Sequence, residues 1–332
     1  MVIHPWAWGI LALVAIGLVV IDFLGHARNP HPPTAAEAGR WTLFYVGLAA
    51  LFGVGIWLTN GWLYAQEFYA GWAMEWSLSV DNLFVFILIL KAFRVPRENQ
   101  QKALLLGIVI ALLLRLAFIL LGAALVSLFS WVFFIFGAWL LWTAVSQVRE
   151  TARGEEEDEE YHENGFIRLV RHVLPITDGF VGNRLLYRHG GHTYLTPLAV
   201  VVLALGSADL MFAFDSIPAI FGITQQAFLV FACNVFALMG LRQLFFLVDA
   251  LLSKLVYLGY GLGVILSFIG VKLILEALHA NTLPFINSGR GVEWAPNISV
   301  SVSLGVIVVT LAVTVVASLI RTAMDEGDAR ER

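Results

Sequence analysis

Long apolar segments constrain this chain more than any other feature. Windows of roughly 20 apolar residues, the length a helix needs to cross a hydrocarbon core about 30 Å thick, occur about nine times. The 332 residues are 59% hydrophobic and 13% charged, whereas soluble domains average about 25% charged residues. The sequence therefore predicts an all-α, polytopic membrane protein. Its expected transmembrane helices lie near residues 5–24, 41–59, 72–93, 103–126, 129–147, 195–220, 227–249, 255–278 and 298–320.

Positively charged residues gather in two connections between these windows. Lys91, Arg94, Arg97 and Lys102 surround the connection between the third and fourth, and a second group of arginines lies between residues 149 and 188. Because cytoplasmic loops are enriched in Lys and Arg, both connections are expected in the cytoplasm. We therefore expect a multi-pass protein of the inner (plasma) membrane, with its N-terminus outside and its C-terminus in the cytoplasm.

The windows and loops divide the chain into five expected segments. The longest loop contains the acidic run "EEEDEE". This run is interpreted either as a solvated, solubilising stretch or as a metal-sensing element. The stretch "GFIRLVRHVLP" after it has helical spacing with basic residues on one side, and is expected on the inner membrane surface. The net charge of −4 points to no nucleic-acid partner. The segments are two N-terminal helices (1–60), a first three-helix unit (61–147), the cytoplasmic loop (148–193), a second three-helix unit (194–279), and the last helix with its tail (280–332).

The two three-helix units resemble each other in sequence. "EWSLSVDN" at residues 75–82 corresponds to "DLMFAFDS" at residues 209–216, because each has two acids six residues apart with a small polar residue after the second. Farther on, "RLAFILLG" from Arg115 resembles "RQLFFLVD" from Arg242, and "FGAWLL" from Phe136 resembles "IGVKLI". A unit of three spans reverses direction at each copy, so the sequence predicts a three-plus-three inverted repeat.

An acidic side chain inside an apolar span raises the free energy of inserting that span into the membrane. Insertion scales assign roughly 2.5–3.5 kcal/mol to an Asp at the centre of a span, so these side chains must face protein, water or an ion. Carboxylate, hydroxyl and amide oxygens favour Mg²⁺, Ca²⁺ or Mn²⁺. The histidines lie in loops or at span ends, and the single cysteine argues against a thiolate site. The four acids of the two motifs carry four negative charges when ionised, whereas Arg115, Arg242 and Lys272 supply three positive charges inside the spans. A divalent ion or protons would neutralise the remaining negative charge.

A second interpretation of the same residues stays open. The four acids would then make helix-packing hydrogen bonds and ion pairs with the two arginines, which are themselves either structural counter-ions or gates of a pathway. Lys272 is long enough to extend to the membrane interface. Glu67 lies at the outer mouth of the third span, and Ser79 is either a ligand or a packing residue.

The acidic motifs resemble those of the TerC family of integral membrane proteins. The resemblance rests on "EFYAGWAMEWSLSVDNLFVF" at residues 67–86, "DLMFAFDSIPAIFGIT" at 209–224, "NVFALMGLRQLFFL" at 234–247 and "YLGYGLGVILSFIGVK" at 257–272. It covers nearly the whole chain. Many members have a Glu where this chain has Gly206, which removes one ligand from the expected set.

The resemblance implies a transporter, because the family is grouped with LysE-like transporters and its members are regarded chiefly as manganese exporters. We therefore expect a non-enzymatic exporter of Mn²⁺, with Ca²⁺ and Mg²⁺ as open alternatives and protons as a candidate coupling ion. The implied Mn²⁺ ligands are Glu75, Asp81, Asn82, Asp209, Asp215 and Ser216. Secondary ligands or pathway residues would be Glu67, Ser79, Arg115, Arg242 and Lys272.

Three rival functions follow from the same features. An intramembrane aspartyl protease also needs paired aspartates, but its Gly-x-Gly-Asp and Tyr-Asp motifs do not surround Asp209 and Asp215. The family's association with tellurium resistance allows a non-transporting component of a tellurite or metal stress-response complex. An exporter of a different small solute is the third alternative. The sequence identifies no protein partner.

Overall fold

The protein is described by a computed structural model. It describes residues 3–27, 35–129, 131–153, 167, 175–177, 179–189, 192–251, 255–279, 281, 283, 286, 287, 290–292 and 294–330. Some side chains within these ranges lie outside the description. They belong to residues 22–27, 35, 36, 80, 81, 84, 189, 192, 242–244, 246–251 and 325–330.

The described chain is built from long α-helices, and each predicted window overlaps one of them. The first group is α1 (Pro5–Ala27), α2 (Ala35–Asn60), α3 (Trp62–Ala92), α4 (Arg97–Leu128) and α5 (Val132–Arg153). The second group is α7 (Pro197–Phe221), α8 (Ala227–Leu251), α9 (Leu258–His279) and α10 (Val300–Arg330).

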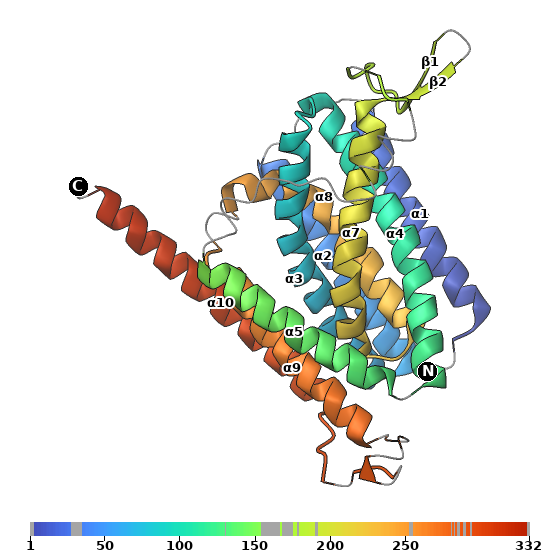
Figure 1. Ribbon diagram of the computed structural model, residues 1–332, viewed down its shortest axis with the longest axis vertical. Helices are drawn as coiled ribbons and strands as arrows, with labels where there is room; N and C mark the ends of the chain where they lie inside the picture. Colours follow the sequence, from blue (N-terminus) through green and yellow to red (C-terminus); the bar gives the residue numbers. More distant parts are fainter. Residues whose placement is uncertain are drawn as a thin grey trace.

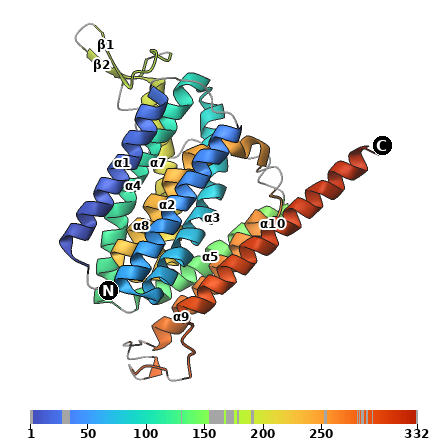
Figure 2. The same ribbon diagram turned by 180° about the vertical axis from the view of Figure 1, so that it is seen from behind.

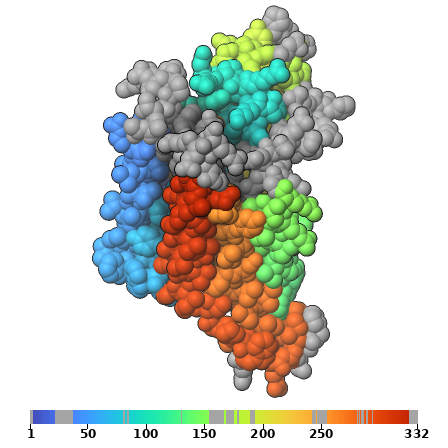
Figure 3. All heavy atoms as spheres, turned by 90° about the vertical axis from the view of Figure 1, so that its left-hand side faces the viewer, coloured from blue at the N-terminus to red at the C-terminus, as the bar shows by residue number. Residues whose placement is uncertain are grey.

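The helices form a bundle with a tilted layer beside it (Figures 1 and 2). Helices α1, α2, α3, α4, α7 and α8 follow the long axis of the molecule, while α5, α9 and α10 cross it obliquely. In the bundle α3 packs against α8 and α4 packs against α7, and in the tilted layer α5 packs along α9. Figure 3 shows α10, α9 and α5 side by side on one face. Because α3 contacts both α7 and α10, it connects the bundle with the tilted layer.

Local sequence signals explain several helix ends. Gly61 has a φ of 96°, a left-handed conformation that glycine adopts without strain, and it separates α2 from α3. Thr196 caps α7 by accepting a hydrogen bond from the Ala199 amide, with Pro197 in the first turn. Inside α7, Pro218 has no amide hydrogen to donate to the Phe214 carbonyl, so the helix lacks one backbone bond one turn beyond Asp215.

Six helices of the described chain have spans long and apolar enough to cross a membrane: α2, α4, α5, α7, α9 and α10. Helices α1 and α8 contribute shorter apolar segments, Pro5–Ile21 and Ala227–Leu241, within the residues searched. Helix α3 is not among the six, and it carries Glu67, Glu75 and Asp81. The protein is therefore a helical, polytopic membrane protein, and the described residues leave the predicted total of nine spans unconfirmed.

The predicted cytoplasmic loop contains a small β-hairpin that the sequence analysis missed. Strand β1 (Leu186–His189) pairs antiparallel with β2 (His192–Leu195), with Leu186 opposite Leu195. The hairpin leads directly into α7, and the Thr196 hydroxyl donates to the Arg184 carbonyl at 2.6 Å. The acidic run 155–160 and the expected surface helix, apart from Ile167 and Pro175, lie outside the described residues.

Candidate functional site

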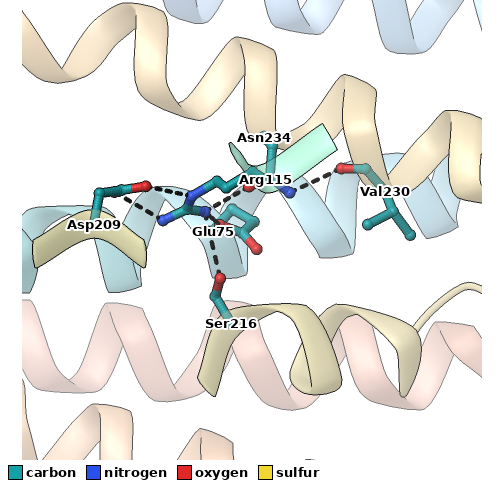
Figure 4. A network of polar contacts seen from close by, with 6 residues as sticks. All are labelled: Glu75, Arg115, Asp209, Ser216, Val230 and Asn234. Carbon is teal, nitrogen blue, oxygen red and sulfur yellow. Dashed lines mark hydrogen bonds and ion pairs between the residues drawn. The ribbon is translucent and has the colours of Figure 1, made fainter. Parts of the chain in front are cut away.

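Arg115 is the centre of a buried polar network at the meeting point of four helices (Figure 4). Its guanidinium extends from α4 to Glu75 on α3, to Asp209 and Ser216 on α7, and to Asn234 on α8. Arg115, Glu75 and Asp209 are all 0% exposed. The first acid of each repeated motif therefore reaches the same cation.

The hydrogen bonds of this network converge on one guanidinium. Arg115 Nε donates to Asp209 Oδ2 at 2.8 Å, and Nη2 donates to Asp209 Oδ1 at 3.1 Å, which makes a bidentate pair. Nη1 faces three oxygens: Glu75 Oε2 at 2.7 Å, Ser216 Oγ at 3.3 Å and Asn234 Oδ1. Because one Nη group carries only two hydrogens, the acceptors around Nη1 outnumber its donors.

Burial makes the charges of this network interdependent. An arginine stays charged in proteins, so two ionised carboxylates beside Arg115 leave one negative charge in excess. Removing one member of a buried ion pair leaves an uncompensated charge, at a cost of about 3–5 kcal/mol. The structure thus realises the ion-pair interpretation for Glu75 and Asp209, with Arg115 as their partner.

Asn234 is a member of this network that the sequence analysis missed as a site residue. Its Nδ2 donates to the Val230 carbonyl at 2.9 Å, which orients Oδ1 toward Arg115. The residue is 0% exposed on α8. An asparagine within the otherwise apolar stretch Ala227–Leu241 was the available signal, since buried polar side chains need partners.

Asp215 lies in a different environment, in a cavity of about 260 Å³ between α3, α5, α7 and α9. Its Oδ1 accepts hydrogen bonds from Trp139 Nε1 at 2.7 Å and Thr143 Oγ1 at 3.1 Å. Asn82 also lines this cavity, as does Glu150 near the end of α5. Trp139 and Thr143 were not predicted as site residues. We call this space the Asp215 cavity.

A second cavity, of about 540 Å³, lies where α3 and α10 begin and where α7 ends. Glu67, Lys272 and Glu276 line it. Thr224 Oγ1 donates to Glu67 Oε2 at 2.6 Å, Lys272 Nζ donates to Ser303 Oγ at 3.1 Å, and Glu276 Oε1 accepts from a glutamine amide at 2.8 Å. Glu276, the acid one helical turn after Lys272, was missed in the sequence. We call this space the Glu67 cavity.

The predicted Mn²⁺ ligands thus occupy two places. Glu75, Asp209 and Ser216 contact Arg115, whereas Asn82 and Asp215 line the Asp215 cavity. Among the described side chains, no three His, Cys, Asp or Glu residues gather in a group that could hold a metal ion. The side chains of Asp81 and Arg242 lie outside the described ones. A single six-residue ligand set therefore stays a prediction.

Two other predicted positions have defined surroundings. Ser79 is fully buried on α3, and its hydroxyl finds no hydrogen-bond partner within the described structure. Gly206 faces α4: a Cβ built there would lie 2.7 Å from Ile110 Cγ2. A glutamate at this position would require Ile110 to move, so the glycine is matched to the close packing of α7 on α4.

Comparison with known proteins identifies the family. Residues 60–326 match the family model described as the integral membrane protein TerC family. This chain belongs to the TerC family. An uncharacterized membrane protein of Mycobacterium tuberculosis (strain CDC 1551) is 45% identical over 94% of this chain and 78% of its own length. The thylakoid membrane protein TERC of Arabidopsis thaliana is 38% identical, over 84% of this chain and 68% of its own.

A third TerC-family relative aligns with this chain over almost the full length of both proteins. It is named the putative membrane-bound redox modulator Alx of Escherichia coli (strain K12), and it is 34% identical over 93% of each chain. No solved structure matches this chain. The TerC family model covers both acidic motifs, so the Arg115 network and the two cavities lie inside the matched region.

Proposed function

We propose that this TerC-family protein exports a divalent metal ion, Mn²⁺, from the cytoplasm. One observation carries the proposal: the repeated acidic motifs meet at a fully buried network, and along α3 the network residue Glu75 lies between Asn82, which lines the Asp215 cavity, and Glu67, which lines the Glu67 cavity. Intramembrane acids facing a bundle interior are typical of ion pathways. Oxygen ligands suit Mn²⁺, and also the alternative ions Ca²⁺ and Mg²⁺.

We propose that α3–α5 and α7–α9 form a three-plus-three inverted repeat. The packing has the reciprocity that such a repeat requires: α3 lies on α8 and α4 lies on α7. The repeated glycines also meet, because a Cβ at Gly137 would lie 2.8 Å from the Gly270 carbonyl and one at Gly270 would lie 3.0 Å from the Gly137 carbonyl. A twofold axis in the membrane plane would pass near this contact.

The two cavities fit opposite sides of the membrane in this proposal. The Asp215 cavity includes Gln147 and Glu150, close to the expected cytoplasmic loop. The Glu67 cavity includes Tyr64, Gln225 and Asn297, which lie near the connections expected outside. This assignment keeps the proposed orientation, with the N-terminus outside and the C-terminus in the cytoplasm.

The residues of the chain would act in sequence during transport. Asn82 and Asp215 would receive Mn²⁺ from the cytoplasm, with Trp139 and Thr143 orienting the carboxylate. Glu75 and Asp209 would hold the ion at the centre, and Glu67 and Glu276 would accept it on the outer side. Movement of one repeat against the other would close the first cavity while opening the second. Protons returning to the carboxylates would balance the exported charge.

The test is Mn²⁺ flux into proteoliposomes containing the purified protein, with and without a pH gradient. The Asp215→Asn variant should lose most of this flux. The matched control is Glu98→Gln, which removes an exposed carboxylate at the start of α4, outside both cavities. Competition with Ca²⁺ and Mg²⁺ ranks the three ions. A folded wild-type protein whose flux does not exceed that of empty liposomes would refute the proposed function.

A further inference from the structure

The oxygens around Arg115 resemble the ligand set of a hard cation. Two carboxylates, a hydroxyl and an amide oxygen from α3, α7 and α8 surround one guanidinium. Ca²⁺, Mg²⁺ and Mn²⁺ take this kind of oxygen set. Three of the oxygens face the single nitrogen Nη1, which has hydrogens for only two of them. The side chain of Arg115 therefore occupies the position that a bound cation would take.

Unpartnered oxygen atoms on the same stretch of α3 as Glu75 point to a ligand. Glu75 Oε1 and the hydroxyls of Ser77 and Ser79 are buried and find no hydrogen-bond partner among the described residues. Glu75 and Ser79 are 0% exposed, and a spacing of four residues places them on one face of α3. Buried polar atoms are nearly always satisfied in a functional state. An ion bound beside Glu75 would give Oε1 a partner.

We propose that Arg115 is a tethered counter-ion that competes with the transported cation for the same oxygens. In the cation-free state its guanidinium pairs with Glu75 and Asp209 and cancels one of their two negative charges. When the divalent ion arrives, Glu75, Asp209 and Asn234 bind the ion, and the guanidinium turns away from them. This inference rests on the proposed function and adds Asn234 to the central ligands.

Competition between Arg115 and the ion would help a carrier in two steps, the return of the empty carrier and the release of the ion. Without a cation, two carboxylates at the centre of the bundle would be buried and uncompensated, which opposes the return of the empty carrier. Arg115 lowers that obstacle because it stays charged at any physiological pH and compensates one of the two carboxylates. Its return to the oxygens also helps to release the ion. Loss of Arg115 should therefore tighten binding and slow transport together.

The experiment has two measurements. Mn²⁺ binding to the full chain purified in detergent is followed by the loss of the electron paramagnetic resonance signal of the free ion, and Mn²⁺ flux is measured in proteoliposomes. Arg115→Gln should bind Mn²⁺ at least tenfold more tightly and transport at least tenfold more slowly. Arg115→Lys keeps the charge without the bidentate fork, so it should bind about threefold more tightly. The control is Arg97→Gln, an exposed arginine of the same helix, whose binding should equal that of wild type.

The outcomes separate this inference from the proposed function. Wild-type protein that neither binds nor transports Mn²⁺ refutes both. Wild-type protein that transports Mn²⁺, with Arg115 variants that bind no more tightly, refutes only the competition. If neither variant folds without Mn²⁺ while wild type transports, both variants are purified in the presence of Mn²⁺. The competition predicts that the bound ion restores the fold, and variants that stay unfolded with Mn²⁺ refute it.

Discussion

Asp209 and Asp215 lie six residues apart on α7 and yet have opposite environments. Asp209 is 0% exposed and makes a bidentate ion pair with Arg115. Asp215 lines a cavity and accepts hydrogen bonds from two neutral side chains. Six residues turn a helix by about 240°, so the two carboxylates face different neighbours. The repeated acids therefore occupy two kinds of environment, one inside the bundle and one at a cavity.

The largest expected effect is on stability, through Asp209→Asn. In this change an amide replaces the bidentate carboxylate partner of Arg115, while Glu75 still balances the charge of the guanidinium. The free energy of unfolding should therefore fall by about 1.5–3 kcal/mol through the loss of charge-assisted hydrogen bonding. Thermal unfolding in detergent measures the change. Asp215→Asn is the control, because its free energy of unfolding should fall by less than about 1 kcal/mol. Equal losses in the two variants would contradict the contrast between the two aspartates.

The next effect tests the helix pair that forms one wall of the Asp215 cavity. In Gly137→Ala the new methyl group would lie 2.7 Å from Ile274 Cγ1 and 2.8 Å from the Gly270 carbonyl, so α5 and α9 must separate. Overpacking of this kind costs about 1–3 kcal/mol. Gly47→Ala on α2, where no atom lies within 4 Å, is the control. If the two variants unfold at the same temperature, the close contact does not stabilise the pair.

Asp215→Asn should separate transport from stability. The amide keeps the size of the side chain but lacks the charge that attracts a divalent ion, so Mn²⁺ flux should fall about tenfold, equivalent to about 1.4 kcal/mol. Far-ultraviolet circular dichroism and the elution volume in detergent should match wild type. Flux at the wild-type level would show that the Asp215 cavity is not part of the route.

The smallest expected effect comes from Thr143→Val. This variant removes one of the two donors to Asp215 Oδ1 while keeping the shape of the side chain. A single hydrogen bond of this kind is worth about 0.5–1.5 kcal/mol, so Mn²⁺ flux should fall about threefold. Thr151→Val, a threonine of α5 that does not line the Asp215 cavity, should keep wild-type flux. A loss of flux in both variants would point to a general disturbance of α5.

The amino-acid sequence was enough to predict the helices and to find the repeated acids. Each apolar window overlaps a helix, because the length and hydropathy of a span are local properties. The spacing of "EWSLSVDN" and "DLMFAFDS" also identified Glu75 and Asp209 as a related pair. The TerC-family assignment followed from these motifs and is confirmed by the match over residues 60–326.

Only the tertiary structure decided which partner each acid has. Arg115 lies 40 residues from Glu75 and 94 from Asp209 in the sequence, and Asn234 completes the network from α8. The rotation of α7 places Asp209 in the network and Asp215 in a cavity. The physical reason is that helix formation depends on nearby residues, whereas the pairing of buried charges depends on how distant helices pack and turn toward one another.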